Sequence, residues 1–152
     1  MAKRNQAFKI VALGEDFVAV MHAQELTRRL AAELEPEFEI STDAWKFEML
    51  DNMPLGREAA RGVARADMII IAASGAFEPP ARVKRWLESR LPQKKTGATA
   101  LIALPDHQNE ALSKSSPLSA YMRRIARKWG MDFFSHPADW WKQLESKTAT
   151  CA

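Results

Sequence analysis

Three short, almost unbroken apolar segments constrain the fold of this chain more than any other feature. They are residues 8–13 (FKIVAL), 67–73 (DMIIIAA) and 98–104 (ATALIAL). A strand with one face in water alternates polar and apolar residues, whereas a strand buried on both faces is apolar nearly throughout. These segments therefore predict the central strands of a parallel sheet that is covered on both sides.

Two weaker segments complete a set of five strands. Residues 38–41 (FEIS) alternate, which fits a strand nearer the edge, and residues 131–135 (MDFFS) are a shorter candidate. Between the strands lie four stretches with an apolar residue every three or four positions, typical of helices that pack one face on a sheet. They are marked by Ala19, Ala23, Leu26, Leu30 and Leu34; by Leu55, Ala59, Val63 and Ala66; by Val83, Trp86, Leu87 and Leu91; and by Leu118, Tyr121, Met122, Ile125 and Trp129.

Two of these helices carry recognisable end signals. The fourth has Ser116 as a natural N-cap, Pro117 at its first position and Gly130 as its stop signal. The third is expected to open with Pro79 and Pro80, because proline is tolerated in a first helical turn.

The alternation of strands and helices predicts an α/β fold. Right-handed crossovers then give a parallel sheet with helices on both faces, a three-layer doubly wound sandwich. Five strands fit the flavodoxin-like order 2-1-3-4-5. We expect a single domain over residues 1–152, with residues 1–6 and 145–152 frayed and a short final helix over residues 137–144.

The composition is that of a globular chain with a mild basic excess. Hydrophobic residues make up 47%, and 22 Lys and Arg against 19 Asp and Glu give a formal charge of +3. The basic residues are spread over several helices, so we interpret them as solvated helix faces and predict no nucleic-acid partner. Cys151 is the sole cysteine, and no segment approaches the roughly 20 apolar residues of a membrane span. We therefore expect a cytoplasmic protein with no membrane association.

A binding site is expected at the carboxyl ends of the strands, near the switch between the first and third. Residues 14–17, 74–78 and 105–115 would meet there. His107 beside Asp106 raises the alternative of acid–base chemistry, but adjacent loop residues rarely face one another, so we favour a solvated pair. Three scattered histidines predict no metal site. The candidate cleft residues are Glu15, Asp16, Trp45, Ser74, Gly75, Ala76, Phe77, Asp106 and His107.

Residues 66–91 resemble the corresponding part of the NADPH-dependent FMN reductase group of the flavodoxin-like fold. In that group an apolar strand leads into a glycine-containing loop, a proline and a helix with lysine and tryptophan, matched here by Gly75, Pro79, Lys84 and Trp86. The match covers about a sixth of the chain. It implies flavin-ring contacts along residues 74–77 and an FMN-dependent NAD(P)H oxidoreductase.

The first loop argues against FMN in its usual mode. A flavin phosphate needs a cradle of backbone N–H groups, usually with Ser, Thr or Gly at the start of a helix. Glu15 and Asp16 stand there instead. Each carboxylate would repel the phosphate by on the order of 1 kcal/mol or more. Acids at this position also suit N-terminal capping, so no cofactor is predicted and FMN is the alternative.

Response-regulator receiver domains share the predicted strand order. Glu15 and Asp16 stand where their metal-binding acidic pair would be. The phosphoacceptor aspartate should end the third strand, where residues 72–74 (AAS) stand, and Pro105 replaces the expected Ser or Thr after the fourth. No lysine follows the fifth strand, so the sequence predicts no receiver-type phosphotransfer.

A larger part of the chain resembles uncharacterised bacterial proteins predicted to be flavodoxin-like. The similar pieces are Glu15–Asp16, residues 45–47 (WKF), residues 66–87 and residues 130–134 (GMDFF). That group often has a histidine before the glycine of the third loop, where this chain has Ser74. The resemblance implies the fold and no particular activity.

Two hypotheses follow from the sequence. The favoured one is a non-catalytic module that binds a partner protein or a small ligand at the carboxyl edge, and the alternative is the FMN-dependent oxidoreductase. Trp140 and Trp141 are consecutive and cannot both face one core, so one of them is a candidate for a homodimer contact.

Overall fold

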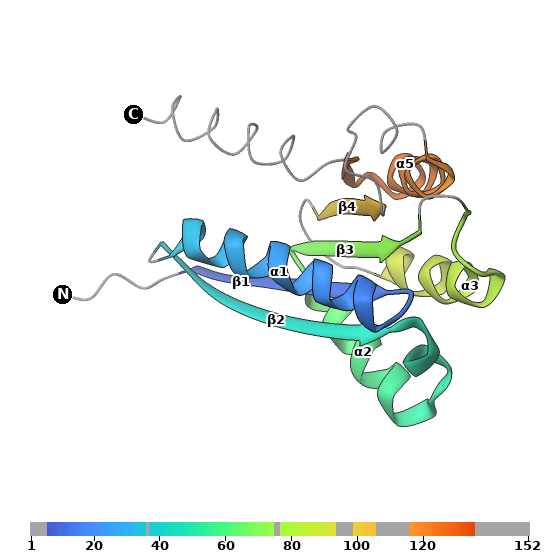
Figure 1. Ribbon diagram of the computed structural model, residues 1–152, viewed down its shortest axis with the longest axis horizontal. Helices are drawn as coiled ribbons and strands as arrows, with labels where there is room; N and C mark the ends of the chain where they lie inside the picture. Colours follow the sequence, from blue (N-terminus) through green and yellow to red (C-terminus); the bar gives the residue numbers. More distant parts are fainter. Residues whose placement is uncertain (1–5, 36, 75–76, 94–98, 106–115, 136–152) are drawn as a thin grey trace.

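The computed structural model describes residues 6–35, 37–74, 77–93, 99–105 and 116–135. Within them a single sheet has the order β2-β1-β3-β4-β5, and every neighbouring pair is parallel (Figure 1). This is the flavodoxin-like order that the sequence predicted. The strands are β1 (Gln6–Gly14), β2 (Phe38–Lys46), β3 (Met68–Ala73), β4 (Ala100–Pro105) and β5 (Asp132–Phe134).

Helices cover both faces of the sheet. One face is packed by α1, and the other by α2, α3 and α5, so that two separate hydrophobic clusters form on either side. The helices are α1 (Phe17–Leu34), α2 (Met53–Arg65), α3 (Ala81–Arg90) and α5 (Pro117–Trp129), with short 3-10 helices η1 (Phe47–Asp51) and η2 (Leu91–Gln93).

β3 shows why the longest apolar run belongs to a central strand. All six of its residues are buried. Ile69 and Ile71 join the cluster under α2, α3 and α5, while Met68 and Ile70 join the cluster under α1. Because successive side chains of a strand point to opposite faces, each face needs its own apolar residue. Burying one such side chain contributes on the order of 2 kcal/mol.

The edge strand β2 is longer than predicted. The alternating residues 38–41 are its first part, but pairing with β1 continues without a break from Gln6↔Phe38 to Gly14↔Lys46. Ser41 and Thr42 are exposed on this edge, so the polar middle of the strand hid its length from a search for apolar runs. An edge strand needs apolar residues only where a helix covers it.

The end signals of the two marked helices had different outcomes. The prediction for α5 is confirmed: Ser119 donates its N–H to Ser116 Oγ at 3.1 Å, and Gly130 ends the helix with φ 68. The prediction for α3 was wrong in detail. The helix begins at Ala81 and Pro80 is its N-cap, so both prolines precede the first turn.

Some sequence predictions fall outside the described residues. These include the final helix over residues 137–144, the frayed ends and the tryptophan pair Trp140 and Trp141. Among the helices that the structure describes, none is both long and apolar enough to cross a bilayer.

Candidate functional site

The connection between β1 and α1 is only two residues long. β1 ends at Gly14 and α1 starts at Phe17, which leaves Glu15 and Asp16 between them. A Cβ on Gly14 would lie 2.5 Å from Val20 Cγ2 and 2.8 Å from the Val20 backbone nitrogen. Glycine is required here because the second turn of α1 lies directly against the end of the strand.

Asp16 caps helix α1. Its Oδ1 accepts a hydrogen bond from the N–H of Ala19 at 2.8 Å, which satisfies one of the donors left open in a first helical turn. A carboxylate also interacts favourably with the positive end of the helix dipole. The capping interpretation of this acid is therefore confirmed.

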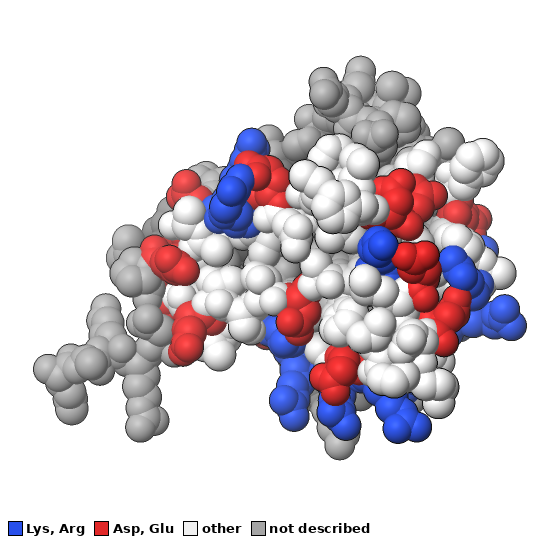
Figure 2. Space-filling model, turned by 60° about the horizontal axis from the view of Figure 1, so that its bottom comes forward, with Lys and Arg blue, Asp and Glu red and all other residues white. Residues whose placement is uncertain are grey.

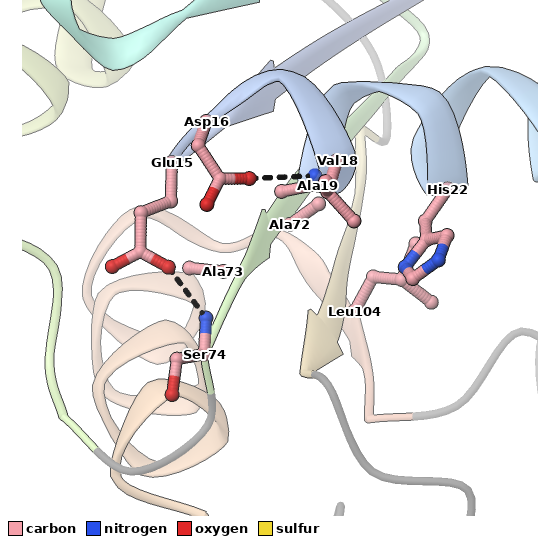
Figure 3. Close-up of a pocket in the computed structure, with 9 residues that line it drawn as sticks. All are labelled: Glu15, Asp16, Val18, Ala19, His22, Ala72, Ala73, Ser74 and Leu104. Atoms are coloured by element: carbon pink, nitrogen blue, oxygen red, sulfur yellow. Dashed lines mark hydrogen bonds between the residues drawn. The ribbon is translucent and has the colours of Figure 1, made fainter.

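Glu15 joins the first loop to the third. Its backbone N–H donates to the Ala72 carbonyl at 2.9 Å, and its Oε2 accepts from the Ser74 N–H at 2.9 Å (Figure 3). β1 and β3 are neighbours at the point where the strand order reverses, which is where ligands of this fold class usually enter. The Glu15 side chain thus bridges the two loops at the mouth of the expected crevice.

A cavity of about 160 Å³ lies beside this bridge. Figure 3 shows the His22 ring on the Leu104 side of the cavity, away from the carboxylates of Glu15 and Asp16. Among the described residues that line the cavity, the imidazole therefore has no carboxylate beside it of the kind that supports acid–base chemistry. The lining residues are Glu15, Asp16, Val18, Ala19, His22, Ala72, Ala73, Ser74 and Leu104.

The structure brings together three of the predicted cleft residues. Glu15, Asp16 and Ser74 line the cavity. Phe77 does not line it and is 75% exposed. The remaining loop candidates, Gly75, Ala76, Asp106 and His107, lie outside the described residues.

Trp45 is not where the sequence placed it. It was expected to follow the second strand, but it lies within β2, opposite Leu13 of β1. Its side chain packs against the cluster under α2, α3 and α5, whereas the cavity lies on the α1 side. The Nε1 atom is buried and has no hydrogen-bond partner in the described part of the chain. Trp45 therefore closes the core at the end of β2.

Several cavity residues were not singled out from the sequence. Val18 and Ala19 lie on α1, and Ala72 and Leu104 lie near the ends of β3 and β4. The available signal was the spacing of one side of a helix, because residues three or four positions apart share a side. Glu15, Val18 or Ala19, and His22 follow that spacing. Val18 was missed because the apolar stripe of the same helix, to which Ala19 belongs, dominates the pattern.

The end of the third loop is fixed by a charged network. Lys84 donates to Glu78 Oε1 at 2.8 Å, and Arg124 Nη2 lies 3.5 Å from the same oxygen. The hydrogen bond from Lys84 holds the pKa of Glu78 below its ordinary value of 4.5. Lys84, which matched the FMN reductase pattern, is thus engaged in an ion pair.

Tyr121 lies beneath this network. Lys84 Nζ and the Arg124 guanidinium carbon each lie 5.5 Å from the centroid of its ring, within range of a cation–π interaction. Burial, together with the nearby Glu88 carboxylate, raises the pKa of Tyr121 above its ordinary value of 10.0. The network joins the third loop to α3 and α5 through side chains.

A second, larger hollow of about 330 Å³ lies between α1 and the edge strand β2. Residues of both elements line it, including Thr27, Ala31, Ile40 and Ala44. It is separate from the loop residues at the carboxyl edge. Among the described residues, no group of three or more His, Cys, Asp or Glu side chains could hold a metal ion.

The positions that receiver domains use for phosphotransfer carry other side chains. β3 ends at Ala73 and β4 at Pro105, so neither strand ends in a phosphoacceptor or a hydroxyl group. No family model, curated protein or solved structure matches the chain. The function of the chain must therefore be inferred from its fold, its loop geometry and its surface chemistry.

Proposed function

We propose that this chain is a non-catalytic flavodoxin-like module that binds a partner protein through the carboxyl edge of its sheet. The observation that carries the proposal is the hydrogen bond from the Ser74 N–H to Glu15. It ties the first loop, where a flavin phosphate would have to bind, to the third loop, where the flavin ring would lie. The resemblance to bacterial flavodoxin-like proteins and the expected cytoplasmic location belong to the same proposal.

The neighbouring acid strengthens this argument. The Asp16 carboxylate already accepts from the Ala19 N–H, a donor that a phosphate at this helix start would need. A phosphate within about 4 Å of either acid would be repelled by about 1 kcal/mol in bulk water and by about 4 kcal/mol near a protein surface. The loop therefore favours the apo form over a flavin complex.

Exposed apolar side chains support a protein partner at this edge. The residues concerned are Phe17, Val18, Met21, Met53, Leu55 and Phe77, which we call the rim residues. They lie in the first two turns of α1, in the first turn of α2 and in the loop after β3, so all are at the carboxyl end of the sheet. Exposed apolar side chains concentrated at one end of a domain favour a protein–protein contact there.

The size of the cavity also favours a protein over a small ligand. Small-molecule sites usually enclose about 300–1,000 Å³. The cavity beside Glu15 has about 160 Å³. A partner that contacts the rim residues needs no deep pocket, because aromatic and methionine side chains can anchor a flat interface.

The alternative remains an FMN-dependent NAD(P)H oxidoreductase. Phe77 favours it, because an aromatic side chain that is 75% exposed in the third loop could stack on a flavin ring. For this function the phosphate would need an anchor other than the first loop, where Glu15 and Asp16 stand.

An absorption spectrum of the freshly purified protein, followed by an FMN titration, separates these functions. We expect a colourless protein, no quenching of flavin fluorescence at micromolar FMN, and no NADPH consumption with added FMN. A yellow protein or saturable micromolar quenching would refute the proposal. A double variant, Glu15→Gly with Asp16→Ser, is the informative comparison, since it removes both carboxylates from the first loop.

A further inference from the structure

Three helices carry a large share of the positive charge of this chain. α2, α3 and α5 together contain eleven Lys and Arg residues and only two acids, Glu58 and Glu88. Their combined formal charge is +9 (eleven minus two), whereas the whole chain carries +3. All other residues together therefore carry a net negative charge.

The fold places these three helices on one face of the sheet. α2, α3 and α5 contribute to the same hydrophobic cluster, and α1 covers the opposite face. Figure 2 shows blue side chains projecting along the lower margin of the molecule. We call this face the basic layer; its cationic residues are Arg57, Arg61, Arg65, Arg82, Lys84, Arg85, Arg90, Arg123, Arg124, Arg127 and Lys128.

Much of this charge is not neutralised. Arg57, Arg65, Arg85 and Arg127 are exposed and form no ion pair with any described residue. Nine of the eleven cationic residues are arginines. The guanidinium group presents a planar fork of donors that matches phosphate oxygens and keeps its charge at every relevant pH. The basic layer is therefore suited to an array of phosphates.

The kind of phosphate array follows from what the layer lacks. A helix that inserts into a membrane surface carries apolar side chains opposite its cations, and a protein interface has an apolar centre. The exposed large apolar residues of the described chain lie at the rim, with only Met53 and Leu55 reaching the start of α2. Exposed aromatic rings, on which single-stranded bases would stack, are also absent from the described part of this layer. Interfaces with duplex nucleic acid, by contrast, are polar and strongly positive.

We propose that the basic layer binds the phosphate backbone of double-stranded nucleic acid without sequence specificity. This differs from the expectation drawn from the sequence, which rested on the spread of the cations over several helices. The fold brings those helices together on one face. The proposal does not depend on the rim residues or on the Glu15–Ser74 contact.

Fluorescence anisotropy with a labelled DNA duplex and an RNA duplex of the same sequence tests it. At physiological salt we expect dissociation constants of about 1–100 µM, tightening steeply as salt is lowered toward about 50 mM. Binding of either duplex supports the proposal. The duplex with the lower dissociation constant identifies whether DNA or RNA is the preferred nucleic acid. An absence of binding to both at about 50 mM salt would overturn it, as would binding to anionic vesicles alone.

Charge-matched variants locate the surface. Arg57→Gln with Arg65→Gln removes two charges from the basic layer, and Arg28→Gln with Arg29→Gln removes two from α1 on the opposite face. If both α2 arginines contact phosphates, the slope of log K against log salt becomes shallower by about 2 for the first variant. The α1 variant should keep the wild-type slope. Equal losses in the two variants would overturn the proposal, and circular dichroism with thermal unfolding confirms that each is folded.

Discussion

At the scale of single residues, the first loop decides what the carboxyl edge can bind. Gly14 lets α1 approach the sheet, Asp16 caps that helix, and Glu15 reaches across to Ser74. The sequence suggested that the acids were unfavourable for a phosphate and suited to capping. It could not show that Glu15 contacts Ser74, because the two residues are 59 positions apart and only the β1–β3 pairing brings them together.

Tyr121 gives a pH-dependent prediction. It is the sole tyrosine, and burial raises the pKa of its hydroxyl in the folded protein. A raised folded-state pKa adds stability that is complete below the unfolded-state pKa of about 10 and is lost as the pH rises above it. Tyrosinate absorbance should therefore appear together with the loss of far-ultraviolet circular dichroism.

The chain unfolded in urea is the control for this titration, since there the same ring ionises at its ordinary pKa. If tyrosinate forms near pH 10 while the circular dichroism is still native, the hydroxyl is solvated in the folded protein and the description of it as buried is wrong.

At the scale of elements, the sequence was most informative where one signal dominated. The apolar runs located the central strands, and Ser116 and Gly130 marked the ends of α5. The length of β2 was underestimated because Ser41 and Thr42 are exposed on the edge strand. Local sequence patterns predict the bounds of a helix or strand well when its burial is uniform, and they miss those bounds when burial varies along the element.

The junction of β1 and α1 gives a stability prediction. Gly14→Ala should lower the free energy of unfolding by about 1–3 kcal/mol, because the added methyl overlaps the backbone of Val20, which cannot move without shifting the helix. Urea denaturation measures the loss.

Gly62→Ala is the matched control for the junction variant. Its Cβ would meet its nearest neighbours at 3.4 Å, and alanine favours a helix interior over glycine by about 0.5–1 kcal/mol. We expect a neutral or stabilised protein. Equal destabilisation by the two substitutions would show that α1 does not pack unusually closely against Gly14 at the end of β1.

At the scale of the whole molecule, two surfaces differ in chemistry. The rim residues are apolar and lie at the carboxyl edge, while the basic layer covers one face of the sheet. The sequence placed residues 14–17 and 74–78, and with them Phe17 and Phe77, at one edge of the sheet. It did not predict the basic layer, because Arg57 and Arg85 are far apart along the chain and the helices that carry them were not assigned to the same face of the sheet.

If the rim residues serve a partner, they should add little to folding. Phe17→Ala and Phe77→Ala should each change the free energy of unfolding by less than about 0.5 kcal/mol, since both side chains are largely in water. Phe47→Ala, at a side chain that is 2% exposed, should cost about 3–5 kcal/mol. A loss of about 2 kcal/mol or more at either rim position would mean that the ring belongs to the core.

The bridge between Glu15 and Ser74 is the contact on which the proposed function depends, and amide hydrogen exchange measures it directly. In Glu15→Ala the Ser74 amide should exchange about tenfold faster than in the wild type, which corresponds to about 1.4 kcal/mol. Glu39→Ala, at an exposed glutamate of β2, should leave the rate unchanged. If the Ser74 amide exchanges equally fast in the wild type and in Glu15→Ala, the two loops are not joined and the crevice is open to a ligand.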